Sequence, residues 1–278
     1  MKAYKKNIPI DIYELYEASV QNIETDINFA KRVFKRYNNK IPKIIREDFC
    51  GTAKLAINWA LKDDKNKSIG IDLNESTLQW SKKNSLSKLN KSQKNRVKLL
   101  NEDVLNCITS KVDITFALNF SYFYFRERQL LKKYLHNVKN SLKKNGLIIM
   151  DIYGGTESVI VKQDYPRTIQ GFTSFNNIQI PDFEYIWDQK KYNPINNYTT
   201  CSIHFKIPKY GYIKDAFTYE WRLWSIPEIL EIMTEVGFKK TAVYLHDFDD
   251  EGISDEIFRV RKNYENTEGW IAYIVGIN

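Results

Sequence analysis

Apolar residues recur at helical spacing near the start of the chain, between Ile12 and about Tyr37. The spacing is three to four residues, which is the period of an amphipathic helix, and it is interrupted near residues 19–21. The pattern predicts one or two helices ahead of the remaining elements. Their apolar positions are Leu15, Val20, Ile23, Ile27, Phe29, Val33 and Phe34.

Short apolar runs then alternate with segments of helical period. Strands are predicted at residues 43–48, 68–72, 97–100, 113–118 and 146–152. Helices are predicted between them at residues 52–61, 75–89 and 126–142. Strand and helix in regular alternation form βαβ units around a parallel sheet.

The helical period disappears from Gly154 to about Asp215. Two antiparallel strands are predicted within this stretch, at residues 183–187 and 199–205 around the turn 193–197. A helix at residues 227–236 and strands at 240–246 and 270–277 follow, with Pro227 in the first turn of the helix and Gly237 just past its end.

The whole pattern predicts an α/β protein of Rossmann-like, doubly wound type with a mostly parallel seven-stranded sheet. We expect residues 1–40 to form an N-terminal helical cap and residues 41–153 the ligand-binding core. Residues 154–216 are expected to form a small antiparallel β insertion after the fifth strand, covering the carboxyl edge of the sheet as a substrate lid. Residues 217–278 complete the core sheet.

The formal net charge of +8 would suit a nucleic-acid partner. However, lysines are spread along the whole chain, and the densest stretch, Lys82 to Lys98, contains no arginine-rich or aromatic-interleaved arm of the kind that stacks bases. We therefore expect a small-molecule partner rather than nucleic acid.

Three cysteines and three histidines are too few and too scattered for a disulfide framework or a metal site. No apolar run approaches the roughly 18 residues of a membrane-spanning helix, and no apolar signal segment follows Met1 to Lys6. These features predict a reduced, metal-free cytoplasmic protein that has no membrane partner and is a monomer or homodimer.

The loop after the first predicted strand, Glu47 to Thr52, contains a single glycine, Gly51. A dinucleotide-binding loop needs three glycines to make room for a pyrophosphate, so the loop argues against NAD or FAD. A cofactor without phosphate fits better, with Glu47 or Asp48 meeting its positively charged amino end. The alternative for Asp48 is that it caps the following helix.

Two further acids follow the next two predicted strands. Asp72 ends the second strand, where a carboxylate can accept hydrogen bonds from both ribose hydroxyls. Asp103 follows the third strand, where a carboxylate can accept a bond from an adenine amino group. Because carboxyl ends of parallel strands share one edge, these acids predict a nucleoside site.

The motifs at these strand ends resemble those of class I S-adenosylmethionine (SAM)-dependent methyltransferases, in particular a bacterial group with an Asp-Phe-Cys-Gly-Thr loop and a Phe-Thr-Tyr-acid-Trp-Arg-Leu-Trp segment. The resemblance covers about residues 41–151 and resumes from Trp221. The segments that carry it are Glu47–Ala53, Gly70–Leu73, Asn101–Val104, Ala117–Tyr122, Arg222–Ile229 and Glu235–Phe238.

The resemblance implies SAM as cofactor. It places the methionine moiety at the loop around Gly51, the ribose at Asp72 and the transferred methyl beside Asn119. The usual loop is acid-x-Gly-x-Gly-x-Gly, and Phe49 and Ala53 replace its first and last glycines, which leaves both Glu47 and Asp48 as candidates for the methionine amino group. The implied cofactor-binding residues are Tyr16, Glu47, Asp48, Phe49, Cys50, Gly51, Thr52, Asp72, Leu73, Asp103, Val104 and Asn119.

Three residues are candidates for catalysis. Tyr122 ends a segment that stands where amino-methyltransferases of nucleic acid and protein carry Asn-Pro-Pro-Tyr, but both prolines are absent, which disfavours base-amine chemistry. His204 is a candidate general base. Arg222 is a candidate clamp for a carboxylate or phosphate, or else pairs with Glu220 or Glu228.

Methyl transfer is an in-line displacement that needs alignment, and it needs a base only if the nucleophile is protonated. Aromatic residues of the insertion either hold an amine by cation–π contact or pack the small sheet. These residues are Tyr185, Trp187, Tyr198 and Phe205, which alternate with His204 along the two strands, and Tyr153 at the entrance of the insertion.

The predicted function is methyl transfer to nitrogen or oxygen of a small molecule. The alternatives are an RNA- or protein-modifying methyltransferase and a non-catalytic SAM-binding protein.

Overall fold

The computed structural model describes residues 10–247 and 254–278. Two groups of elements can be treated separately. The insertion unit consists of the described residues up to Gln21 together with Val159–Leu223, and the core unit consists of Asn22–Ser158 and Trp224–Asn278.

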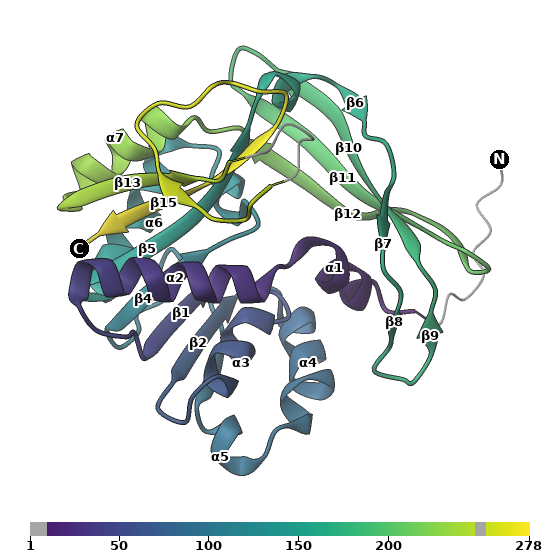
Figure 1. The fold of residues 1–278 in the computed structure, drawn as a ribbon, viewed down its shortest axis with the longest axis horizontal. Helices are drawn as coiled ribbons and strands as arrows, with labels where there is room; N and C mark the ends of the chain where they lie inside the picture. Colours follow the sequence, from purple (N-terminus) through teal and green to yellow (C-terminus); the bar gives the residue numbers. More distant parts are fainter. Residues whose placement is uncertain (1–9, 248–253) are drawn as a thin grey trace. The chain divides into compact units, whose positions relative to one another are not determined.

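The core unit is built on an eight-stranded sheet of order β14-β13-β15-β5-β4-β1-β2-β3 (Figure 1). Strands β1 to β5 pair in parallel, whereas β15 runs antiparallel to both β5 and β13. The strands are β1 (Ile44–Asp48), β2 (Lys67–Asp72), β3 (Val97–Asn101), β4 (Val112–Ala117), β5 (Leu142–Gly154), β13 (Lys240–Leu245), β14 (Arg259–Val260) and β15 (Trp270–Ile277).

The predicted α/β fold with a mostly parallel sheet is confirmed. The sheet has one strand more than the seven expected because β14, only two residues long, pairs with the end of β13. So short a pairing leaves no recognisable alternation of apolar and polar residues in the sequence.

Two helices of the core unit, α2 and α7, begin and end at residues with clear capping chemistry. Asn22 caps α2 and Asn39 ends it in the left-handed conformation. Ser225 and Glu228 form a capping box at α7, which ends at Gly237 with φ of 90°. The helices are α2 (Ile23–Asn38), α3 (Lys54–Leu61), α4 (Glu75–Asn84), α5 (Lys91–Lys94), α6 (Arg128–Ser141) and α7 (Ile226–Val236), with short 3-10 turns η1 (Leu86–Lys88), η2 (Ser121–Tyr124) and η3 (Thr156–Val159).

The main apolar cluster of the core unit joins α2 to the sheet (Figure 1). Phe29 on α2 stacks on Tyr273 of β15 with ring centroids 4.3 Å apart. Trp59 of α3 is fully buried in the same cluster. The helical spacing of the apolar residues in α2 is thus explained by burial of one face of the helix.

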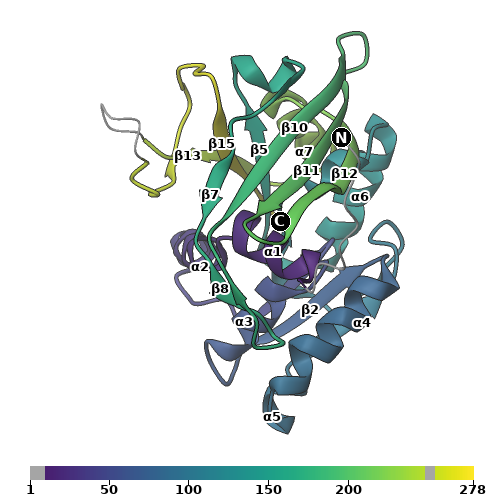
Figure 2. The same ribbon diagram turned by 90° about the vertical axis from the view of Figure 1, so that its right-hand side faces the viewer.

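The insertion unit contains three long antiparallel strands that lie side by side (Figure 2). The two strands predicted around the turn at 193–197 are present and longer than expected, because β10 continues past residue 187 to Asn193 and β11 extends beyond both ends of its predicted range. The elements are α1 (Ile12–Val20), β6 (Lys162–Gln163), β7 (Arg167–Ile169), β8 (Phe172–Thr173), β9 (Gln179–Ile180), β10 (Phe183–Asn193), β11 (Tyr198–Ile207) and β12 (Gly211–Arg222).

The two N-terminal helices belong to different units. Helix α1 packs Leu15 into the apolar cluster of the insertion unit, whereas α2 packs on the core sheet. The chain passes from one unit to the other between Gln21 and Asn22.

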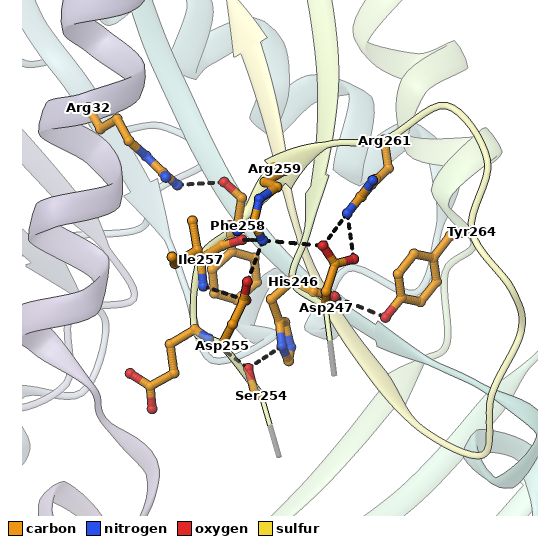
Figure 3. A network of polar contacts seen from close by, with 11 residues as sticks. Arg32, His246, Asp247, Ser254, Asp255, Ile257, Phe258, Arg259, Arg261 and Tyr264 are labelled. Carbon is orange, nitrogen blue, oxygen red and sulfur yellow. Dashed lines mark hydrogen bonds and ion pairs between the residues drawn. The ribbon is translucent and has the colours of Figure 1, made fainter. Parts of the chain in front are cut away.

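A polar network closes the connection between β13 and β15 in the core unit (Figure 3). Asp247 pairs with Arg259 and Arg261, and Arg259 also pairs with Asp255. Arg32 of α2 donates to a backbone carbonyl of the same connection. Each of these arginines has an acidic or carbonyl partner, so we interpret the network as structural.

Within the described ranges, no helix is long and apolar enough to cross a membrane. The described residues likewise contain no group of three or more histidine, cysteine or acidic side chains that could hold a metal ion.

Candidate functional site

The loop after β1 adopts a left-handed backbone at alternate positions. The φ angles of Phe49, Gly51 and Ala53 are 55°, 51° and 57°. Only glycine adopts this conformation without strain, and these are the three positions where the resembled loop carries glycine. The loop therefore keeps a glycine-type backbone although two of the glycines are absent.

The side chain at Phe49 is anchored by packing. Its ring contacts Phe125 and Tyr134, with centroids 5.7 and 5.6 Å away. Ala53 is fully buried, and its N–H donates to the carbonyl of Cys50 at 2.7 Å. These contacts offset the cost of placing non-glycine residues in the left-handed region.

Asp48 lies in a buried polar network beneath the loop. Its Oδ1 accepts from Nε of Arg46 at 2.5 Å, and its Oδ2 accepts from the hydroxyl of Tyr134 at 2.8 Å. Burial alone would lower the pKa of the Arg46 guanidinium, but the neighbouring carboxylate keeps that pKa raised. Asp48 is thus committed to the core and does not cap α3.

Glu47 points to the opposite face of β1, since successive residues of a strand alternate. Its Oε2 accepts from the N–H of Ala56, in the first turn of α3, at 2.8 Å. The helix-capping role considered for Asp48 is therefore filled by Glu47. A carboxylate at this helix end is also favoured by the helix dipole.

Asp72, at the end of β2, is tied to the same loop. Its Oδ2 accepts from the N–H of Gly51 at 2.7 Å, and its Oδ1 accepts from that of Asn74 at 2.8 Å. A side chain at Gly51 would meet no heavy atom within 4 Å. The loop therefore has open space on the side where a ligand would approach its backbone.

The third predicted acid follows β3. Oδ1 of Asp103 accepts from the N–H of Leu105 at 2.8 Å, while Val104 is buried and its carbonyl accepts from Asn137. Strands β1, β2 and β3 are neighbours in the sheet, so their carboxyl ends bring Glu47, Asp72 and Asp103 to one edge.

The turn after β4 is held by an acid that the sequence reasoning missed. Asn119 and Phe120 both have φ of 57°. Their N–H groups donate to Oδ2 and Oδ1 of Asp151, on β5, at 2.7 and 2.8 Å. The signal available in the sequence was an acid late in an apolar strand, the same signal that marked Asp72.

No protein-family model and no curated protein sequence matches this chain. Solved structures match it over nearly its whole length. A SAM-dependent methyltransferase from Clostridium acetobutylicum is 19% identical, with 96% of this chain and 97% of that chain covered and a TM-score of 0.63. Streptomyces venezuelae DesVI is 13% identical, with 96% and 98% covered and a TM-score of 0.67. The sugar N-methyltransferase KedS8 from Streptoalloteichus is 10% identical, with 100% and 96% covered and a TM-score of 0.64. The chain has the methyltransferase fold.

Tyr122, a candidate for catalysis, lies beneath the turn after β4 of this methyltransferase fold. It is fully buried, and among the described residues its hydroxyl has no hydrogen-bond partner. Burial raises the pKa of the phenol well above its ordinary value. A proton-transfer role for Tyr122 is therefore disfavoured.

His204, the candidate base, is 1% exposed within the insertion unit. Its Nε2 lies 3.1 Å from Oδ2 of Asp188, and its Nδ1 accepts from the N–H of Asp215 at 2.8 Å. The second contact assigns the proton to Nε2. Both nitrogens are engaged, which points to a structural role.

The register of the insertion sheet also separates His204 from Tyr185 and Trp187, although its ring lies 5.7 Å from that of Tyr212. His204 pairs with Ile186, whereas Phe205 pairs with Tyr185. Because neighbouring residues face opposite sides of a sheet, the histidine lies on the face opposite Tyr185 and Trp187. The expected aromatic wall therefore does not include it.

The aromatic face of this sheet packs against itself and against α1. Tyr219 and Trp221 stack with centroids 4.4 Å apart, and Tyr16 packs on Phe217 at 4.9 Å. Arg222, the candidate clamp, ends β12 and pairs with Tyr198 along the backbone. Tyr16 and Arg222 both lie in the insertion unit.

Proposed function

We propose that this chain is a SAM-dependent methyltransferase that acts on a nitrogen atom of a small molecule. The observation that carries the proposal is the loop after β1, whose left-handed positions Phe49, Gly51 and Ala53 retain a glycine-type backbone. Two acids accept hydrogen bonds from this region of the backbone. Asp72 accepts from the N–H of Gly51 in the loop, and Glu47 accepts from the N–H of Ala56 in α3. The methyltransferase fold places such a loop at the carboxyl edge of the sheet.

The residues present suit SAM. Glu47, at the N-terminus of α3, would meet the methionine ammonium group, because Asp48 is already paired with Arg46. Asp72 uses one lone pair on each oxygen for the chain, and the remaining lone pairs can accept from ribose hydroxyls. Asp103 with Val104 would receive the adenine.

The remaining contacts of the proposed site come from the loop and from the turn after β4. The hydroxyl of Thr52 is buried and, within the described residues, has no partner. A ligand beside the loop would supply one. Cys50 and Leu73 complete the surroundings, and Asn119 would lie next to the transferred methyl. When bound, SAM supplies an activated methyl on a sulfonium.

Nitrogen is favoured over oxygen as the attacking atom because the candidate general bases are buried. A hydroxyl acceptor needs a general base in the transition state, and both Tyr122 and His204 are buried away from solvent. A neutral amine needs only alignment with the methyl. Two of the matching structures are described as an amino pentose methyltransferase and a sugar N-methyltransferase, which supports an amino sugar as acceptor.

We further propose that the protein works in the cytoplasm as a monomer or homodimer, without a nucleic-acid partner. Its three cysteines are buried, and within the described residues none of them is in a disulfide. The lysines that make up the net charge of +8 are dispersed along the chain.

Calorimetric titration with SAM tests the first half of the proposal. We expect binding by the full chain and a loss of roughly tenfold or more in Asp72→Asn, because a hydrogen bond to a charged group contributes about 1.5–3 kcal/mol. Asp64→Asn is the matched control, since this exposed carboxylate stands before β2 rather than at its end. No binding at millimolar SAM would exclude the function.

The acceptor is tested with matched pairs of sugars that differ only in carrying an amino or a hydroxyl group. S-adenosylhomocysteine should form with amino compounds and not with their hydroxyl counterparts. Formation with the hydroxyl member alone would contradict the nitrogen assignment while leaving SAM binding intact.

A further inference from the structure

The turn after β4 contains two consecutive residues in the left-handed conformation. Asn119 and Phe120 both have φ of 57°; asparagine adopts this region comparatively readily, whereas for Phe120 it costs roughly 1–2 kcal/mol. Such strain persists only where surrounding contacts hold it. The hydroxyl of Ser121 and the packing of Phe120 on Tyr153 support this turn, and the contacts that hold the N–H groups of the two left-handed residues are their bonds to the carboxylate of Asp151.

Beyond the turn itself, the carboxylate has charged or titratable neighbours on three elements of the core unit, α2, η2 and β15. Asp26 of α2 lies near it and receives a hydrogen bond from the hydroxyl of Tyr273, on β15. Tyr122 and Tyr273 both interact electrostatically with Asp151. Burial, together with the charge of Asp26, raises the pKa of Asp151 to about 7, despite the two N–H donors that lower it.

Protonation changes what Asp151 can hold. The ionised carboxylate accepts with both oxygens, so both N–H groups have an acceptor. A proton on one oxygen makes that oxygen a weaker acceptor, and its O–H must point away from the N–H group that it faced. One of the two hydrogen bonds is thereby weakened next to a buried carboxyl group, so the turn is expected to change conformation.

We propose that Asp151 is a positioning residue of the site: its ionised carboxylate fixes the Asn119–Phe120 turn beside the transferred methyl, and its protonation releases the turn. The part concerning the methyl rests on the proposed function. The hold on the turn does not, because the contacts exist within the chain alone. Activity is therefore expected to rise with pH as Asp151 loses its proton.

Selective labelling tests the hold on the turn directly. The sequence contains two Asn–Phe dipeptides, at residues 28–29 and 119–120. Labelling asparagine carbonyls with ¹³C and phenylalanine nitrogens with ¹⁵N therefore selects two amide signals. We expect the amide of Phe120 to titrate with a midpoint near pH 7. The titration should vanish in Asp151→Asn and move to lower pH in Asp26→Asn, because a like charge nearby raises an acid pKa.

Asp113 provides the matched control. Its Oδ2 also accepts two consecutive backbone N–H groups, from Lys43 and Ile44, at 2.9 Å each. Asp113→Asn removes a similar structural tie but should leave the Phe120 titration unchanged. A Phe120 amide that does not titrate in the wild type, or that titrates equally in Asp151→Asn, would overturn the proposal.

A second measurement links the turn to turnover. With an amine that the wild type methylates, Asp151→Asn should lower kcat by about tenfold or more, as expected for a misplaced reacting group. The Kd for SAM should stay within about twofold, because Asp151 is not part of the cofactor contacts. Unchanged kcat would overturn the positioning role. If SAM does not bind at all, the proposed function fails, while the amide titration still decides whether Asp151 holds the turn.

Discussion

The hydroxyl of Tyr134 donates to Oδ2 of Asp48 at 2.8 Å, while the ring of the same residue packs on Phe49. One side chain of α6 thus supports both the buried ion pair under the loop and the side chain that replaces a glycine in it. The conformation of the candidate cofactor loop therefore depends on packing from beneath.

Removing the Tyr134 hydroxyl should destabilise the protein. Tyr134→Phe leaves a buried carboxylate oxygen without its donor, which costs about 1–3 kcal/mol of unfolding free energy. Tyr122→Phe is the matched control, since Tyr122 is equally buried but its hydroxyl has no partner among the described residues. Urea unfolding of the two variants gives the comparison. Equal stability loss in both would show that the bond to Asp48 contributes nothing.

Restoring glycines to the loop should have different consequences for stability at its two ends. Phe49→Gly relieves a left-handed residue but removes the ring that packs on Phe125 and Tyr134, so we expect a net loss of about 1–3 kcal/mol. Ala53→Gly removes one methyl and relieves the same strain, with a net change near zero. Thermal unfolding of both variants measures the difference. A stabilising Phe49→Gly would mean that the ring packing is not what maintains the loop.

Replacing Asp48 should mainly lower stability, whereas replacing Glu47 should mainly lower the affinity for SAM. Asp48→Asn leaves the guanidinium of Arg46 buried without a carboxylate, which costs about 3–5 kcal/mol of stability. Glu47→Gln keeps an oxygen for the N–H of Ala56, so its stability should change little, while SAM affinity falls roughly tenfold through loss of the charge. Urea unfolding and calorimetry separate the two effects. A stable Asp48→Asn that cannot bind SAM would transfer the methionine role to Asp48.

Stability should fall as pH rises from about 4 to 7. Burial raises the pKa of Asp26 to about 6 and that of Asp151 to about 7, both from 3.8. In this range the native state retains protons that the unfolded chain has lost, so their contribution is complete below pH 4 and is lost as pH rises.

The Asp26→Asn variant measures the size of this effect. It should remove about 3 kcal/mol of the decline, because the pKa of Asp26 is raised by about two units and each unit corresponds to about 1.36 kcal/mol. Asp113 gives the opposite sign, because the N–H groups of Ile44 and Lys43 lower its pKa despite burial. Its contribution is lost as pH falls, so Asp113→Asn should lessen acid sensitivity. Unfolding free energies across a pH series test both variants. An unchanged pH slope in Asp26→Asn would contradict the assignment.

The fold was predictable because its signals are local. Apolar runs of strand length alternate with helical periods from residue 43 to residue 152, and caps such as Ser225 and Gly237 mark a helix by their chemistry. The acids at strand ends were found for the same reason. Parallel strands bring their carboxyl ends together wherever the intervening helices lie.

The buried polar network was not predicted, because partners distant in sequence determine it. Arg46 stands inside an apolar strand, and only the facing Tyr134 of α6 shows why the strand tolerates a charge there. The pair Arg46 and Asp48, two residues apart and so on one face of the strand, was a signal that sequence reasoning did not use. Similarly, the position of His204 depended on strand register, which a sequence does not specify.

The division of the chain between the two units has a consequence for its synthesis. Leu15 of α1 is buried with Phe183 of β10 and Phe205 of β11. These two strands leave the ribosome much later than α1. In the core unit, β15 lies between β5 and β13 in the sheet, although it follows both in the sequence. Contacts this distant in sequence slow folding and prolong the exposure of apolar surface. The nascent chain therefore carries α1 without its packing partners until β11 is made, and an open sheet until β15 is made, and that interval is when chaperones would be needed most.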